Sequence, residues 1–191
     1  MEDFARATAE DPEVTAVRAT LYRIGDDNVL AESLIRAARA GKDVAVLLEA
    51  RARFDELTNL EWALRFQNSG VRVLRLPAKK VHAKVIYVRR GERDYVHLGT
   101  GNYNPVNGRL YTDLSLFTCD RRLTADARSF FDALEAGKAP APRLMRTGPR
   151  VRQLLVERIR GEGRPGGHVI LKCNHLTDRK VLTALRDAAA A

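Results

Sequence analysis

The chain has 191 residues, of which 45% are hydrophobic and 30% charged, and its formal net charge at pH 7 is +9. This composition excludes a disordered or fibrous protein, and no apolar run approaches the roughly 20 residues of a membrane-spanning helix. The acidic start of the chain has no apolar signal core, and Cys119 and Cys173 lie far apart, so we expect a reduced, cytoplasmic protein.

The first half of the chain alternates between strand and helix patterns. Asn28 is the expected N-cap of the first helix, and Gly41 and Gly70 are expected to end the two helices. Two successive strand–helix–strand units predict an α/β fold whose sheet is partly parallel. The predicted segments, in chain order, are a strand at 14–22, a helix at 28–41, a strand at 43–50, a helix at 56–70 and a strand at 71–76.

After Pro77 the pattern changes to extended runs separated by short polar turns. We expect three more strands of the same sheet, at 80–90, 94–104 and 110–120. A helix is predicted at 123–137, with Thr124 as its N-cap.

The segment at 138–149 contains three of the seven prolines and is predicted to be a linker. A helix, a strand at 168–174 and a final helix at 176–191 follow it. One strand and one helix cannot build a core of their own. We therefore expect a first domain at 1–147, and a linker helix with the truncated start of a second, similar domain at 148–191.

The middle of the chain carries the residues with the most reactive chemistry. Alternate side chains of a strand share a face, so His82 and Lys84 are expected to project together. If the GTGNYN segment is extended, the same parity puts three neutral side chains on one side: Thr100, Asn102 and Asn104. An imidazole, an ammonium and neutral donors form the kind of set that phosphoryl transfer needs. His97 and Trp62 are interpreted as structural residues.

This arrangement of H-x-K followed by G-[ST]-x-N resembles the half-site of the phospholipase D superfamily. In that superfamily the histidine attacks phosphorus, while the lysine and asparagine hold the oxygens. An aspartate usually follows the lysine by five residues, and this chain has Arg89 there, which argues against ordinary phosphodiester hydrolysis. Two alternatives stay open: a phosphodiesterase or nuclease that completes its site by dimerising, and a non-catalytic polyanion-binding remnant, which the charge of +9 permits.

Longer sequence words resemble the polyphosphate kinase family, which uses ATP. They are TLYR from Thr20, EARARFDELTNLEWA from Glu49, KKVHAKV from Lys79, YVHLGTGNYNP from Tyr95 and RLYTDLSLFT from Arg109. The implied fold is α/β: a phospholipase D-like domain with a mixed sheet flanked by helices, the first of two such domains in the catalytic half.

The resemblance also implies roles for individual residues. His82 is the residue that ATP phosphorylates, and Lys84 supports it. Arg23 and Arg53 match the arginines of the magnesium–phosphate site, and Tyr111 matches a tyrosine that contacts the nucleotide phosphate. Phosphate binding is also expected of Thr100, Asn102 and Asn104.

We therefore expect a fragment of a polyphosphate kinase that is inactive alone. The parent enzyme would transfer the terminal phosphate of ATP reversibly to inorganic polyphosphate through a phosphohistidine, with Mg²⁺ as cofactor. The expected partners are ATP, ADP and polyphosphate, with a homo-oligomer in the full-length protein and no specific nucleic acid. The positive charge is also compatible with peripheral association with a membrane.

Overall fold

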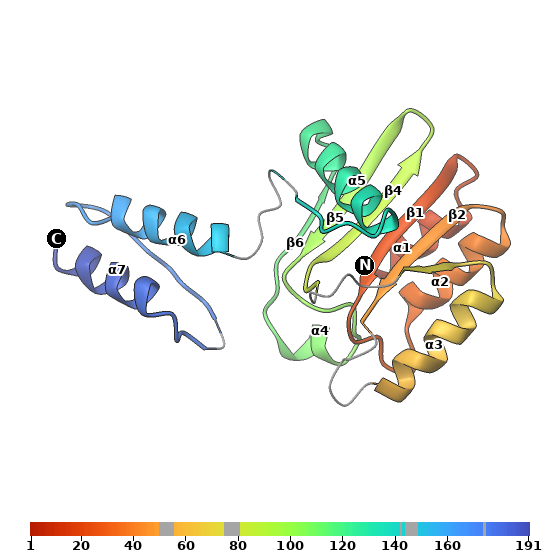
Figure 1. Cartoon of the computed structure of the whole chain (residues 1–191), viewed down its shortest axis with the longest axis horizontal. Helices are drawn as coiled ribbons and strands as arrows, with labels where there is room; N and C mark the ends of the chain where they lie inside the picture. The colour runs from red at the N-terminus through yellow and green to blue at the C-terminus, as the bar shows by residue number, and fades with distance from the viewer. Residues whose placement is uncertain (50–55, 75–80, 142, 144–148, 174) are drawn as a thin grey trace. The chain divides into compact units, whose positions relative to one another are not determined.

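The computed structural model describes most of the chain (Figure 1). The described residues are 1–49, 56–74, 81–141, 143, 149–173 and 175–191. The chain divides into two compact units, Met1–Leu144 and Met145–Ala191.

The first unit is built on a six-stranded mixed sheet with the strand order β3-β2-β1-β4-β5-β6. The strands β1, β2 and β3 are parallel, whereas β4 pairs antiparallel with β1, β5 with β4 and β6 with β5. This arrangement confirms the expected α/β fold with a mixed sheet. The strands are β1 (Val14–Leu21), β2 (Asp43–Leu48), β3 (Arg72–Leu74), β4 (Lys84–Arg90), β5 (Arg93–Gly99) and β6 (Ser115–Thr118).

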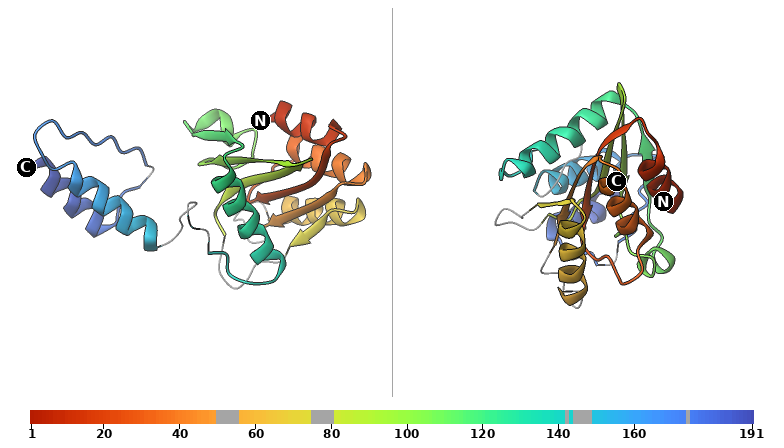
Figure 2. Two further views of the ribbon diagram at one scale, coloured as in Figure 1. Left: turned by 90° about the horizontal axis from the view of Figure 1, so that it is seen from above. Right: turned by 90° about the vertical axis from the view of Figure 1, so that its right-hand side faces the viewer.

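Helices cover both faces of this sheet. Figure 2 shows α5 on one face and α1, α2 and α3 on the other. The side chain of Asn28 accepts a hydrogen bond from the N–H of Ala31, which confirms it as the N-cap of α2. The helices of this unit are α1 (Glu2–Glu10), α2 (Val29–Arg39), α3 (Glu56–Asn68), α4 (Asn107–Leu110) and α5 (Arg121–Glu135).

A hydrophobic core lies between the sheet and the helices α1 to α3. Val17, Val46 and Ile86 come from three neighbouring strands and are buried, as are Trp62 and Phe66 from α3. Burying an aliphatic or aromatic side chain of this size contributes roughly 1.5–3 kcal/mol. This core holds the central strands in place and so supports the edge of the sheet at which they end.

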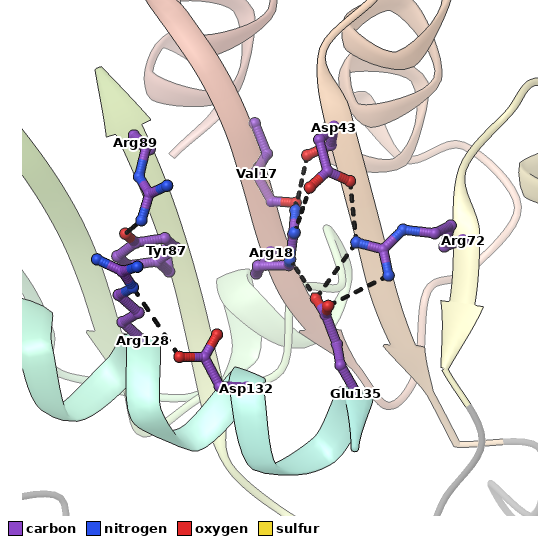
Figure 3. Close-up of polar contacts among 9 residues, drawn as sticks. All are labelled: Val17, Arg18, Asp43, Arg72, Tyr87, Arg89, Arg128, Asp132 and Glu135. Atoms are coloured by element: carbon purple, nitrogen blue, oxygen red, sulfur yellow. Dashed lines mark hydrogen bonds and ion pairs between the residues drawn. The ribbon is translucent and has the colours of Figure 1, made fainter. Parts of the chain in front are cut away.

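A network of ion pairs fastens the end of α5 to the opposite face of the sheet (Figure 3). Arg18 of β1 contacts both Asp43 of β2 and Glu135 of α5. Arg72 of β3 lies 2.9 Å from Asp43 and 3.2 Å from Glu135. Burial opposes ionisation of Asp43, but hydrogen bonds from Arg18 and Arg72 outweigh it and lower the pKa of that carboxyl group. The network therefore ties three strands to one helix.

Three of the predicted strands are markedly too long. The strand expected at 80–90 begins only at Lys84, so His82 precedes β4 rather than lying on it. The strand expected at 94–104 ends at Gly99, and the one expected at 110–120 contracts to β6, with part of α4 before it. The physical reason lies in Thr100: its N–H still bonds to the carbonyl oxygen of Leu114, but its hydroxyl, rather than its backbone carbonyl, accepts from the N–H of Leu114, and the backbone pairing of β5 with β6 ends there. Residues 100–104 are consequently not extended, and the parity argument does not apply to Asn102 and Asn104.

The predicted N-cap of α5 is also wrong. The carboxylate of Asp120, rather than the hydroxyl of Thr124, accepts hydrogen bonds from the N–H groups of Arg122 and Leu123. A carboxylate accepts more strongly than a hydroxyl and also interacts favourably with the helix dipole. Sequence reasoning missed α1 entirely, whose Ala5, Thr8 and Ala9 are buried.

The second unit contains α6 (Pro149–Gly161) and α7 (Arg179–Ala189), which pack through Ile159, Val181 and Ala184. The strand predicted at 168–174 is wrong, because residues 168–173 form no strand and Ile170 is exposed. A strand needs a neighbour to take its backbone hydrogen bonds. In the described ranges, no helix is long and apolar enough to cross a membrane.

Candidate active site

The residues singled out from the sequence gather at one edge of the sheet. The strands β1 and β5 end at this edge and β4 begins there, because β4 runs antiparallel to both. Lys84, the first residue of β4, lies opposite Gly99, the last residue of β5. The His82–Lys84 pair and the start of the GTGNYN segment are therefore neighbours in space, and Arg23 follows β1 by two residues.

His82 and Lys84 are in direct contact. The imidazole of His82 is exposed, whereas Lys84 is only 6% exposed. The Nζ atom of Lys84 lies 2.9 Å from Nε2, 3.0 Å from Nδ1 and 2.8 Å from the carbonyl oxygen of His82. An ammonium group can only donate, so a ring nitrogen that accepts its hydrogen bond carries a lone pair. Which ring nitrogen of His82 accepts depends on its tautomer.

The aromatic ring of Tyr22 lies beside this pair. It contacts the imidazole of His82 edge to face, with ring centroids 5.4 Å apart. Nζ of Lys84 and Cζ of Arg23 each lie 6.0 Å from the centroid of the tyrosine ring, at the outer limit of a cation–π interaction. Two cations thus lie near an exposed imidazole, an arrangement that suits an anionic phosphate. Arg53 lies outside the described residues.

The side chain of Thr100 makes hydrogen bonds within the protein. Its hydroxyl donates to Oδ1 of Asp113 at 2.9 Å and accepts from the N–H of Leu114 at 3.0 Å. The next residue, Gly101, approaches Asp113 so closely that a β-carbon there would overlap the carboxylate. Asp113 therefore holds the start of the loop that carries Asn102.

Three other predicted site residues surround one cavity of about 540 Å³: Asn102, Asn104 and Tyr111. His97 also lines it, whereas His82 and Lys84 do not. Within the described part of the chain, Oδ1 of Asn102 and Nε2 of His97 are buried without a hydrogen-bond partner. The predicted residues thus fall into two groups. Arg23, His82 and Lys84 lie around Tyr22, whereas Asn102, Asn104 and Tyr111 line this cavity.

The segment that follows β1 is held against the cavity. Gly25 has a φ of +75°, and a β-carbon there would meet the amide nitrogen of Asn104 at 3.0 Å. Its carbonyl oxygen accepts a hydrogen bond from the indole of Trp62 at 2.8 Å, and Asn28 donates to the carbonyl oxygen of Tyr103 at 2.6 Å. These contacts link α2, α3 and the GTGNYN loop to the end of β1.

His97 lies inside the core. It is 2% exposed, and its Nδ1 lies 2.8 Å from the hydroxyl of Tyr103. Burial lowers the pKa of His97 to about 4 and raises the pKa of Tyr103 well above its usual value. The imidazole is therefore neutral at pH 7, unlike an exposed histidine that titrates near neutrality.

The described residues provide no obvious set of protein ligands for a metal ion. Among them, no three His, Cys, Asp or Glu side chains lie close enough to hold a metal. The guanidinium of Arg23 has N–H donors and no lone pair to offer, so it cannot coordinate a cation. The donor set around Tyr22 therefore fits phosphate rather than Mg²⁺ itself.

The sequence left Thr20 and Tyr22 without a role, and it offered for Asp113 only the general role of orienting a site residue. Thr20 and Tyr22 belong to the word TLYR, and Asp113 belongs to RLYTD. The words pointed to these residues, but only the structure shows that each contacts the segments at 82–85 or 100–101.

Comparison with known proteins identifies relatives over the whole chain. Residues 1–140 match the family model described as polyphosphate kinase C-terminal domain 1. The polyphosphate kinase of Pseudomonas aeruginosa is 41% identical over 202 residues, which cover 99% of this chain and 29% of that protein. That of Halalkalibacterium halodurans is 39% identical over 201 residues, covering 99% and 28%. The chain thus spans less than a third of the length of these relatives.

Solved structures agree with this comparison. The crystal structure of polyphosphate kinase from Porphyromonas gingivalis matches with a TM-score of 0.74 and 31% identity, covering 98% of this chain and 33% of that one. A phospholipase D family member, Nuc from Salmonella typhimurium, matches with a TM-score of 0.56 and 14% identity, covering 74% and 90%. The second match concerns the fold alone, and it confirms the expected phospholipase D-like architecture.

Proposed function

Because this chain belongs to the polyphosphate kinase family, we propose that it carries the phosphate-accepting histidine of such an enzyme. The parent protein would transfer the terminal phosphate of ATP to inorganic polyphosphate, and His82 would hold the phosphate between the two halves of the reaction. The observation that supports this most directly is the contact between the exposed imidazole of His82 and the ammonium of Lys84.

The proposed reaction has two steps. A neutral ring nitrogen of His82 attacks the γ-phosphorus of ATP, a nitrogen–phosphorus bond forms, and the bond from that phosphorus to the bridging oxygen breaks, so that ADP leaves. A terminal oxygen of polyphosphate then attacks the same phosphorus. The nitrogen–phosphorus bond breaks, the polyphosphate grows by one phosphate, and the imidazole is restored. The reverse sequence makes ATP.

The cations around Tyr22 would act on the charge of the transferred group. Lys84 is close enough to His82 to reach an oxygen of a phosphate bound there, and Arg23 lies on the same aromatic ring. Preorganised donors of this kind stabilise the charge that develops in the transition state. Asn102, Asn104 and Tyr111 would bind further phosphates from the cavity that they line. A magnesium ion, if it takes part, would arrive with the phosphates of the nucleotide.

Since the chain spans less than a third of its relatives, we propose that the 191 residues do not complete the reaction by themselves. A direct comparison uses the chain alone and a chimera in which it replaces the matching segment of the Pseudomonas aeruginosa polyphosphate kinase. The chimera should make polyphosphate from ATP, and the chain alone should make none. Synthesis by the isolated chain would show that the half-site suffices.

The test of His82 uses the same chimera and ATP labelled at the γ-phosphate. Label should bind the protein, survive alkali and be lost in acid, as expected of a phosphohistidine. His82→Ala should abolish both the label and polyphosphate synthesis, whereas His168→Ala, a change at an exposed histidine of the second unit, should preserve both. Label that persists in the His82→Ala protein, or that resists acid, would rule out His82 as the nucleophile.

A further inference from the structure

A side chain replaces the backbone ladder at the point where β1 and β4 approach the site. The last paired residues are Ala19 and Ile86. Beyond them, the hydroxyl oxygen Oγ1 of Thr20 accepts a hydrogen bond from the N–H of Val85 at 3.0 Å and donates to the carbonyl oxygen of Ala83 at 2.7 Å. Thr20 is 4% exposed, so water does not compete freely for these groups.

The two backbone groups that Thr20 binds lie on either side of Lys84. Ala83 separates Lys84 from His82, and Lys84 in turn donates to the carbonyl oxygen of His82. A single buried hydroxyl therefore fixes the backbone on both sides of the lysine and immediately after the histidine. Tyr22, two residues further along the chain from Thr20, contacts the imidazole itself.

We propose that Thr20 is a positioning residue for His82, and that the segment Thr20–Tyr22 sets the orientation of the imidazole from β1. The hydroxyl of Thr20 holds the backbone at 83–85, which places Lys84 on the ring nitrogens, and the ring of Tyr22 limits the rotation of His82. The effect of this positioning on catalysis rests on the proposed phosphotransfer. The orientation of His82 itself can be measured without any reaction.

An ordinary structural hydrogen bond and a positioning contact predict different results. Thr20→Val keeps the volume of the side chain and removes both hydrogen bonds. If Thr20 only joins two strands, the change lowers stability and leaves the environment of His82 as it was. If Thr20 positions the site, the ring nitrogens of His82 lose their fixed contact with Lys84, and their chemical shifts move.

The experiment measures nitrogen-15 spectra of the histidine rings and amide exchange in the 191-residue chain. Thr20→Val should shift the ring-nitrogen signals of His82, and the Val85 amide should exchange roughly tenfold faster for the loss of one hydrogen bond. Thr20→Ser, which keeps the hydroxyl, should restore both signals. Thr118→Val is the matched control, because it removes the hydroxyl that accepts from the N–H of Asp120 and should leave His82 unchanged.

A folded Thr20→Val chain whose His82 signals match those of the unchanged protein would overturn the proposal. If that variant does not fold, Thr20→Ala is read by the same criterion. In the chimera, Thr20→Val should slow the labelling of His82 and leave the KM for ATP unchanged. Failure of the unchanged chimera to be labelled would contradict the proposed function, whereas unmoved His82 signals contradict the positioning role alone.

Discussion

The Nδ1 atom of His97 lies 2.8 Å from the hydroxyl of Tyr103, and both side chains are buried. This contact joins β5 to the loop that follows it. Because a buried imidazolium would be poorly solvated there, protonation of His97 opposes folding.

The first prediction concerns pH. Burial lowers the pKa of His97 from 6.5 to about 4, so between these values the unfolded chain binds more protons than the folded chain and stability rises with pH. The free energy of unfolding should therefore fall as pH drops from 6.5 to about 4, by up to about 3 kcal/mol from this group. Urea unfolding at several pH values measures it. His97→Asn should flatten the pH dependence, whereas exposed His168→Asn should not; equal slopes in all three proteins would contradict this account.

The second prediction concerns the ion pairs at the end of α5. Arg18, whose side chain is 12% exposed, loses one of its two carboxylate partners in Glu135→Ala. We expect a loss of about 1–3 kcal/mol in the free energy of unfolding, because a poorly solvated charge keeps fewer partners. Asp132→Ala in the same helix removes an exposed pair with Arg128 and should cost less than about 1 kcal/mol. Equal losses from the two variants would show that the network adds no stability beyond surface pairing.

The third prediction concerns Gly101. A β-carbon there overlaps the carboxylate of Asp113, so Gly101→Ala should lower the free energy of unfolding by about 1–3 kcal/mol. Gly108→Ala, at a position with open space around it, should have little effect. Adding Asp113→Ala should recover part of the loss, and a double-mutant cycle measures the coupling. Strictly additive effects would mean that the two residues do not interfere.

The fourth prediction concerns Lys84 in the chimera. Lys84→Met removes the cation beside His82 and should slow formation of the phosphoenzyme on the order of 10²-fold. Rapid-quench labelling with ATP measures this rate. Lys172→Met, which removes an exposed lysine in the second unit, serves as the control. An unchanged rate in Lys84→Met would remove the lysine from the proposed mechanism.

Much of the fold follows from local pattern. The N-cap signal at Asn28 is local, and the helix α2 begins where it predicted. The polar segment at 100–104 was expected to stay extended, but the hydroxyl of Thr100 binds the N–H of Leu114, fourteen residues away. A contact between residues so far apart in the sequence cannot be predicted from a short sequence window. The ends of β5 and β6 were therefore missed.

The site divides in the same way. The spacing of His82 and Lys84 is local, and the two side chains are in contact as expected, although His82 precedes β4 rather than lying on it. The placement of Asn102 beside a cavity depends instead on a turn stabilised by Asp113, and the support of Thr20 comes from a different strand. The sequence motifs include Thr20 and Asp113 but do not reveal which atoms these residues bind.

The order of strands also has a consequence for synthesis on the ribosome. β1 is the first strand to be made, yet it lies between β2 and β4 in the finished sheet. During translation it must wait for residues 84–90 before its second edge is covered, and Arg18 must wait longer still for Glu135. A nascent chain that ends before α5 therefore exposes one face of its central strands, a surface of the kind that chaperones bind and that promotes association between unfinished chains.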